Sequence, residues 1–289
     1  MPHSIRFWIY VHPVVPWDTH MRRVQHAEEL GFDAVTVADH FGDWAGRRIP
    51  YFEMWSQLAA IATATTTIRL APMVAQIPLR NPAMFALQAM TVDHISGGRL
   101  DLGLGIGLTG DPSYRMMGLE NWGVKERVAR FGEYVEVVHR LLTQEEVTYR
   151  GRYYQLDAAR LCPRPVQSPR PPIMIAAMGR RMLTHAARHA DIWNCMSFAN
   201  TFEAQMEEAH QPVVEMDACC AAVSRDPNSL RRSFYMHDPN GRSRHGLLEI
   251  YDSEEIFTQM IEHVLSLGIQ EVALIYPIRE EQMPVFERM

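Results

Sequence analysis

The strongest indication of the fold is the stretch IRLAPMVAQIPLRNPAMFALQAMTVDHISGGRLDLGLGIG, residues 68–107. Residues 68–75 and 100–104 are short apolar runs, which are typical of buried β-strands. Between them, residues 82–95 repeat apolar side chains at helical spacing, and Ser96-Gly97-Gly98 ends the helix. A strand, a helix and a second strand in this order predict two parallel strands with a helix packed over them.

The same alternation extends over the rest of the chain. Apolar runs predict further strands at residues 5–11, 34–38, 173–177, 191–195, 233–236 and 271–276, and helical spacing predicts helices at residues 18–30, 50–66, 122–142, 180–189, 202–223 and 253–267. Asp18 is the candidate N-cap of the first of these helices, and Gly31 is its stop. About eight strands alternating with helices predict an α/β fold, a (β/α)8 TIM barrel, as a single domain over residues 1–289. A doubly wound sheet is the alternative, and it is disfavoured because no G-x-G-x-x-G motif follows the first strand.

One segment interrupts this alternation. The sequence VTYRGRYYQL, residues 147–156, predicts a hairpin that turns at Arg150-Gly151. Residues 161–172 include five prolines, so we expect an extended surface loop there. Together they predict an insertion around residues 145–172 of the barrel.

The composition narrows the range of functions. Of the 289 residues 47% are hydrophobic, and 28 basic against 34 acidic side chains give a net charge of −6. We therefore expect no nucleic-acid partner, because such proteins normally carry a basic stripe. The four cysteines lack paired spacing, the first residues lack the features of a signal peptide, and no apolar run approaches the roughly 18 residues of a membrane span. The expectation is a cytoplasmic protein with no membrane span.

Polar and aromatic residues recur where the predicted strands end, and in a barrel those ends hold the active site. They are Tyr10 and His12 after the first strand, Asp39, His40 and Trp44 after the second, Val74 and Gln76 on the third, Gly105, Ile106 and Gly107 after the fourth, Ala177, Met178 and Gly179 after the fifth, and Asn194, Cys195 and Met196 at the sixth. Taken alone, the pair Asp39-His40 also fits an ordinary turn, because short motifs have low specificity.

Two of these strand ends suit contact through the backbone. GLGIG, residues 103–107, lacks bulky side chains and would let a flat ligand approach the main chain. AAMGRRML, residues 176–183, places a glycine before a helix, where free N–H groups and Arg180 or Arg181 would hold a phosphate. A glycine-rich turn and an ordinary loop explain these two stretches equally well.

Other chemistries fit the sequence poorly. It has no zinc-binding spacing, no G-x-S-x-G nucleophile elbow and no phosphate-binding G-x-x-x-x-G-K-[ST] loop. The strand ends offer one Asp and one or two His, so we expect no metal. Apolar walls with few metal ligands suit an organic cofactor that carries the chemistry itself.

The chain resembles the bacterial luciferase-like family of flavin- and deazaflavin-dependent oxidoreductases. The similarity lies in AEELGFDAVTVADHF, in QLAAIATATTTIRLAPMVAQIPLRNPAMFALQAMTVDHISGGRLDLGLGIG, in ERVARFGEYVEVVHRLLT, in GRYYQL and in PRPVQSPRPPIMIAAMGRRMLTHAARHADIWN, over roughly residues 25–195. The stretch ADHFGDW, with Asp39, His40 and Trp44, looks most like the branch that uses the deazaflavin coenzyme F420. The family fold is a (β/α)8 barrel, which is the fold that the alternation predicts.

The resemblance also implies roles for residues. His40 and Trp44 would lie beside the reactive face of the F420 ring, and a cis peptide bond between Met73 and Val74 would support the ring. The other cofactor contacts would come from Asp39, Gly105, Ile106 and Gly107, from Ala177, Met178, Gly179 and Arg180 around the phosphate, and from Cys195 on the far wall.

Three positions depart from the pattern of the resembling enzymes. Leu108 stands where the sugar-phosphate dehydrogenases of this branch have a catalytic Glu, and Met196-Ser197-Phe198 stands where they keep a Lys for the substrate phosphate. We therefore do not expect phosphosugar oxidation by that route. Ile106 stands where the luciferases carry an Arg for the flavin phosphate, which disfavours FMN.

The leading hypothesis is hydride transfer between F420 and an apolar organic molecule. His40 would be the general acid/base, because imidazole titrates near neutral pH, with Asp39 orienting it. The substrate pocket would be lined by Tyr10, His12, Trp44, Met196 and Phe198. The alternatives are an FMN-dependent monooxygenase that uses O2 and a cofactor-binding barrel without turnover. We expect a homodimer or a higher homo-oligomer.

Overall fold

The computed structural model describes residues 5–236 and 247–288. One parallel sheet has the strand order β3-β2-β1-β11-β10-β9-β8-β5-β4. Its strands are β1 (Arg6–Tyr10), β2 (Ala34–Val37), β3 (Arg69–Pro72), β4 (Ala75–Gln76), β5 (Leu102–Gly105), β8 (Ile173–Ala176), β9 (Ile192–Met196), β10 (Arg231–Tyr235) and β11 (Glu271–Ile275). A parallel bridge between Leu70 and Leu100 joins the β3 edge to the chain entering β5, so the sheet closes into a barrel.

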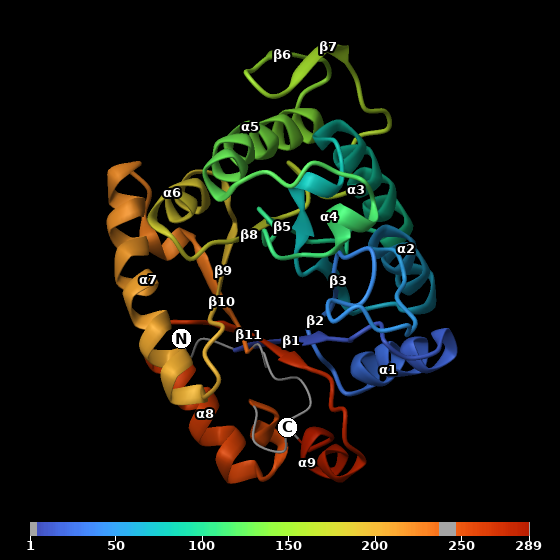
Figure 1. Cartoon of the computed structure of the whole chain (residues 1–289), viewed down its shortest axis with the longest axis vertical. Helices are drawn as coiled ribbons and strands as arrows, with labels where there is room; N and C mark the ends of the chain where they lie inside the picture. The colour runs from blue at the N-terminus through green and yellow to red at the C-terminus, as the bar shows by residue number, and fades with distance from the viewer. Residues whose placement is uncertain (1–4, 237–246, 289) are drawn as a thin grey trace.

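The helices are α1 (Trp17–Glu29), α2 (Met54–Ala64), α3 (Pro82–Ser96), α4 (Ser113–Met116), α5 (Val124–Thr143), α6 (Arg180–His189), α7 (Phe202–Ala222), α8 (Glu254–Ser266) and α9 (Met283–Phe286). The longer helices surround this barrel, whereas the short α4 lies at its strand ends (Figure 1). Short 3-10 turns are η1 (Ile77–Leu79), η2 (Pro227–Ser229), η3 (Leu247–Tyr251) and η4 (Glu280–Gln282). The predicted (β/α)8 barrel is confirmed. In the described part of the chain no helix is long and apolar enough to cross a membrane.

Side chains along the strands alternate between the barrel interior and the helix layer, as the period of two requires. The interior cluster consists of Trp8, Ala34, Ala71, Met73, Met174, Ile192 and Ala273. Neighbours on the same strands, such as Ile9, Val35 and Leu70, pack in the larger cluster with the helices. Trp8 therefore fills the middle of the barrel together with alanine, methionine and isoleucine side chains.

The predicted third strand, residues 68–75, is divided in the structure. Its first part, β3, pairs with β2, and its second part, β4, pairs with β5. The division falls at Met73-Val74, whose peptide bond is cis, as the family resemblance implied. The strand therefore exchanges its neighbour half-way along, which an apolar run in the sequence does not reveal.

The predicted cap of the first helix is wrong. The structure has Pro16 as the N-cap of α1, with no side-chain capping hydrogen bond, and Asp18 lies in the first turn. A carboxylate there still interacts favourably with the positive end of the helix dipole. Gly31 follows the helix at a φ of +85°, in the left-handed region where glycine is preferred.

The insertion is a hairpin beyond α5 at one edge of the barrel (Figure 1). Its strands, β6 (Val147–Arg150) and β7 (Gln155–Ala159), are antiparallel. Arg150 faces Gln155, so the turn spans residues 151–154 and not Arg150-Gly151 alone. Glu133 of α5 accepts the backbone N–H groups of residues 152, 153 and 154 at 2.9, 2.8 and 3.1 Å, which fastens the hairpin to the barrel.

Candidate active site

Asp39 follows β2 and is buried at the carboxyl end of the barrel. Its carboxylate accepts Nη1 and Nη2 of Arg80 at 2.5 and 2.9 Å and the backbone N–H of Gln76 at 2.9 Å. The sequence predicted that Asp39 orients His40, but both carboxylate oxygens are engaged by these other groups. Asp39 instead joins the end of β2 to the last residue of β4 and to Arg80 beyond it.

The carboxylate that contacts His40 is Asp111. Nδ1 of His40 lies 2.7 Å from Oδ2 of Asp111, whose side chain is 1% exposed, whereas that of His40 is 26% exposed. Oδ1 of Asp111 accepts the backbone N–H of Ser113 at 2.8 Å. Burial alone would raise the pKa of Asp111, but hydrogen bonds from His40, Ser113 and Gln76 hold it below its usual value. Asp111 is therefore ionised at neutral pH.

The side-chain amide of Gln76 connects these two acids. Its Nε2 donates to the backbone carbonyl of Asp39 at 2.6 Å and to Oδ2 of Asp111 at 2.7 Å. Its Oε1 accepts the hydroxyl of Tyr114. Nη1 of Arg127, a fully buried guanidinium, donates to that hydroxyl oxygen at 2.9 Å.

Aromatic rings surround the exposed side of His40. Trp44, which is 45% exposed, and Tyr51 both meet its ring edge-on, with centroids 5.7 and 6.1 Å away. Tyr10 and His12 continue this group, with centroids 5.4 Å apart. Nδ1 of His12 is buried without a hydrogen-bond partner, and burial lowers the pKa of His12 to about 4. His12 is therefore a neutral imidazole at neutral pH.

The glycines at the end of β5 are required by contacts within the protein. A Cβ on Gly103 would lie 1.9 Å from the carbonyl oxygen of Pro72, so glycine allows β3 and β5 to close the barrel. Gly107 has a φ of +69°, and its Cβ would lie 2.3 Å from both Gln76 Oε1 and the Tyr114 hydroxyl. Gly105 packs against Val74 in the same way, with 2.5 Å to Cγ2. These contacts account for the glycines without a ligand.

The residues predicted after β8 lie at the start of α6. Ala177 packs toward the helices, whereas Met178, Gly179 and Arg180 are exposed. Gly179 is the N-cap of α6 and makes no side-chain capping bond, so the first N–H groups of the helix have no side-chain acceptor at the cap. Free N–H groups at a helix N-terminus can bind an anion, and the phosphate site predicted there stays a prediction.

The structure corrects the predicted position of Cys195. On β9, Ile192 points into the barrel, so Asn194 and Met196 share its side and Cys195 faces the helices. Cys195 has no exposed surface, and burial raises the pKa of its thiol to about 12. Met196, on the inner side, and the exposed Phe198 beyond it remain as candidate walls of the pocket.

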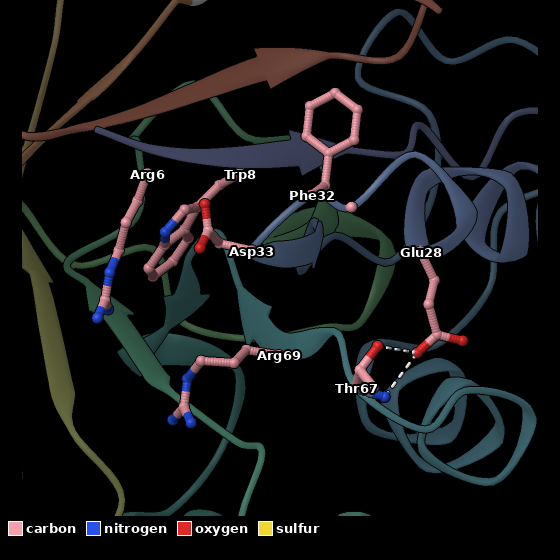
Figure 2. A pocket seen from close by; sticks show the side chains of 8 residues that line it. Arg6, Trp8, Glu28, Phe32, Asp33, Thr67 and Arg69 are labelled. Atoms are coloured by element: carbon pink, nitrogen blue, oxygen red, sulfur yellow. Dashed lines mark hydrogen bonds between the residues drawn. The ribbon is translucent and has the colours of Figure 1, made fainter. Parts of the chain in front are cut away.

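A cavity of about 330 Å³ lies at the opposite end of the barrel, where the strands begin (Figure 2). It is lined by Arg6, Trp8, Glu28, Gly31, Phe32, Asp33, Thr67 and Arg69. Much of its charge is already paired: Arg69 binds Asp101, and Glu28 accepts the backbone N–H groups of residues 66–68. It lies far from His40, so we place the site at the other end.

Sequence reasoning missed most of the partners of the predicted residues. Gln76 was recognised only as a strand end, and Tyr51, Arg80, Asp111, Tyr114 and Arg127 were not singled out. One local signal existed, since the stretch DPSY, residues 111–114, has the Asp and Pro that are typical of a turn before a helix. Among the described residues no group of three or more His, Cys, Asp or Glu side chains is placed to hold a metal ion.

The family model described as luciferase-like monooxygenase matches residues 3–238 of the chain. The chain belongs to this family. Among its curated relatives is an F420-dependent glucose-6-phosphate dehydrogenase from Amycolatopsis mediterranei, 34% identical over 174 residues that cover 59% of this chain. The match spans about half the length of that relative, 51%. A relative with the same description from Intrasporangium calvum is 35% identical over 175 residues.

Solved structures share the whole fold of this luciferase-like chain. An F420-dependent secondary alcohol dehydrogenase in complex with an F420-acetone adduct has a TM-score of 0.83 at 18% identity, covering 99% of this chain and 98% of its own. A long-chain alkane monooxygenase has a TM-score of 0.79 at 15% identity, covering 100% of this chain and 90% of its own. At these identities the likeness establishes the barrel fold alone.

Proposed function

We propose that this chain is an oxidoreductase that transfers a hydride between coenzyme F420 and an uncharged, largely apolar organic substrate. The observation that carries the proposal is the hydrogen-bonded pair of His40 and Asp111 at the carboxyl end of the barrel. The partly exposed ring of His40 lies beside Trp44 and Tyr51. A positioned imidazole of this kind suits general acid/base catalysis. The F420-dependent relatives support the choice of cofactor.

Several features of the strand ends fit such a cofactor. The buried Nδ1 of His12 lacks a partner within the protein, and the N-terminus of α6 has no side-chain cap. We assign the cofactor phosphate to residues 177–180, with Arg180 supplying charge, and the ring to the neighbourhood of Met73, Val74 and Ile106. Bound F420 would supply the hydride chemistry, and the protein would supply orientation and a proton.

The proton belongs to His40 in this proposal. When a substrate carbinol carbon loses a hydride, its hydroxyl must also lose a proton, and His40 is the base that accepts it. In the reverse direction His40 returns the proton to the carbonyl oxygen. Trp44 walls the pocket, and the substrate is expected between Tyr10, His12, Trp44, Met196 and Phe198.

An FMN-dependent monooxygenase is the second candidate, because the family description itself names monooxygenases. Titration of the full chain with F420 and, separately, with FMN distinguishes the two by fluorescence. We expect tighter binding of F420, and roughly tenfold weaker F420 binding in Arg180→Gln, since a charge-assisted hydrogen bond contributes about 1.5 kcal/mol or more. Arg188→Gln, at the other end of α6, is the matched control and should bind as the wild type does. Preference for FMN would overturn the choice of cofactor, and binding of neither would favour a barrel without turnover.

We further propose a homo-oligomeric assembly, with the homodimer as the commonest closed form. Met84 and Leu87, about one turn apart on α3, are both exposed and would supply apolar contact area. Light scattering of the purified chain tests this, and a monomer at micromolar concentration would contradict it. The cytoplasmic location stays a prediction.

A further inference from the structure

A chain of hydrogen bonds runs from Arg127 to His40 through Tyr114, Gln76 and Asp111. Two of these groups, the guanidinium of Arg127 and the carboxylate of Asp111, can each take only one role in a hydrogen bond. A guanidinium donates and never accepts, whereas an ionised carboxylate accepts and never donates. Every hydrogen bond between these two groups therefore has a defined direction.

The direction can be followed from the guanidinium. Nη1 of Arg127 donates to the hydroxyl oxygen of Tyr114, so that hydroxyl turns its own proton toward Oε1 of Gln76. The opposite orientation of the Gln76 amide would place Oε1 at 2.6 Å from the carbonyl oxygen of Asp39 and at 2.7 Å from Oδ2 of Asp111. Two such oxygen–oxygen contacts are repulsive, so Nε2 must face both acceptors.

This orientation uses both amide hydrogens of Gln76, one on each acceptor. The remaining contact, 2.7 Å between Nδ1 of His40 and Oδ2 of Asp111, then needs its proton on Nδ1. Nε2 of Gln76 also lies 3.1 Å from Nδ1 of His40. This contact is not a hydrogen bond, because both nitrogens donate to Oδ2 of Asp111.

We propose that this chain of hydrogen bonds holds His40 as the Nδ1–H tautomer, with Asp111 as its positioning residue, so that Nε2 is the atom that exchanges the reaction proton. The tautomer itself follows from the contacts, and only its use in catalysis rests on the proposed function. In alcohol oxidation the hydroxyl proton passes to Nε2 as the hydride leaves carbon for the cofactor. Asp111 then lies 2.7 Å from the imidazolium and stabilises its charge.

Asp111 also helps to hold its own loop in place, and the test must separate this structural role from its effect on the imidazole of His40. Ser113, two residues later, accepts the backbone N–H of Phe41 on its hydroxyl at 2.9 Å, so this loop is joined to the end of β2 at a second point. Ser113→Ala removes that second connection and leaves the carboxylate of Asp111 in place. It is the matched control for loosening of the loop.

The experiment is nitrogen NMR of the full chain labelled with ¹⁵N-histidine, without cofactor, at an alkaline pH where imidazoles are neutral. His40→Gln identifies the signals of His40 among the 13 histidines. We expect a protonated Nδ1 and an unprotonated Nε2 in the wild type and in Ser113→Ala. In Asp111→Ala the acceptor is gone, and Nε2 of Gln76, 3.1 Å from Nδ1 of His40, is free to donate to Nδ1, so we expect the opposite tautomer, with the proton on Nε2. A wild-type protein with Nε2 protonated, or an unchanged pattern in Asp111→Ala, would overturn the proposal.

Kinetics with F420 test whether catalysis depends on the Nδ1–H tautomer of His40. Asp111→Ala should lower the rate of hydride transfer by about 10³–10⁴-fold, as loss of the correct tautomer does in serine proteases, with the Kd for F420 changed less than about threefold. Asp111→Glu should keep part of the rate, because it retains an acceptor. A normal rate in Asp111→Ala would contradict the positioning role. If the chain binds no F420 at all, the proposed function fails while the NMR result still decides the tautomer.

Discussion

Breaking the buried ion pair of Asp39 and Arg80 at one partner should destabilise the protein strongly, because it leaves an unpaired buried charge. Arg80→Met removes both charge-assisted hydrogen bonds to Asp39 and leaves its carboxylate with the Gln76 N–H as its remaining donor. The two side chains are 4% and 14% exposed, so little water can replace the guanidinium. Removal of one partner of a buried pair costs about 3–5 kcal/mol. We expect the free energy of unfolding of Arg80→Met to fall by that amount.

Urea unfolding followed by circular dichroism measures this loss. Arg160→Met is the control, because Arg160 and Glu146 form an exposed pair whose loss should change the free energy of unfolding by less than about 1 kcal/mol. The double variant Asp39→Asn with Arg80→Met should recover part of the stability, since it leaves no buried charge. A loss below about 1 kcal/mol in Arg80→Met, or a double variant no more stable than the single one, would show that Asp39 is not an unpaired buried charge in the variant.

Two further predictions concern stability. In Gly103→Ala the new Cβ would lie 1.9 Å from the carbonyl oxygen of Pro72, so the strands must separate and the free energy of unfolding should fall by about 3 kcal/mol or more; an unchanged urea midpoint would contradict this. Burial lowers the pKa values of His12, His20 and His189 to about 4, while unfolded histidines have a pKa near 6.5. The unfolded chain therefore binds more protons between about pH 6.5 and 4, and stability should fall as the pH falls through this window, by up to about 4 kcal/mol per pH unit if all three contribute. Urea titrations across this range test the slope, and a flat profile would show that these histidines are not buried neutral groups.

Local patterns were sufficient to predict most of the fold. Whether a segment forms a strand or a helix depends largely on the spacing of its own apolar residues. This spacing was enough to predict β2, β8, β11, α3 and α5. The division of the third strand depends on contacts with β2 and β5. Pro72, directly before Met73, is its one local signal, because proline is rare inside a central strand. Nothing in the sequence distinguished Pro16 from Asp18 as the helix cap.

The site was predicted less completely, for a related reason. Asp39 and His40 were identified at a strand end, but the groups that bind them, Arg80 and Asp111, lie 41 and 71 positions further along the chain. Because Asp39 and His40 are adjacent in sequence, we expected them to contact each other. Consecutive side chains after a strand point in different directions, so Asp39 binds Arg80 and His40 binds Asp111. The error at Cys195 was avoidable, because alternation from the apolar start of β9 already separates Cys195 from its two neighbours.

The most direct test of the central claim is the reduction of F420 by a panel of secondary alcohols, compared in the wild type and in His40→Ala at saturating F420. We predict turnover of at least one uncharged alcohol by the wild type, a loss of about 10²–10⁴-fold in His40→Ala, and a similar Kd for F420 in both proteins. Turnover of the same alcohol by His40→Ala at the wild-type rate would contradict the assignment of His40 as the acid/base.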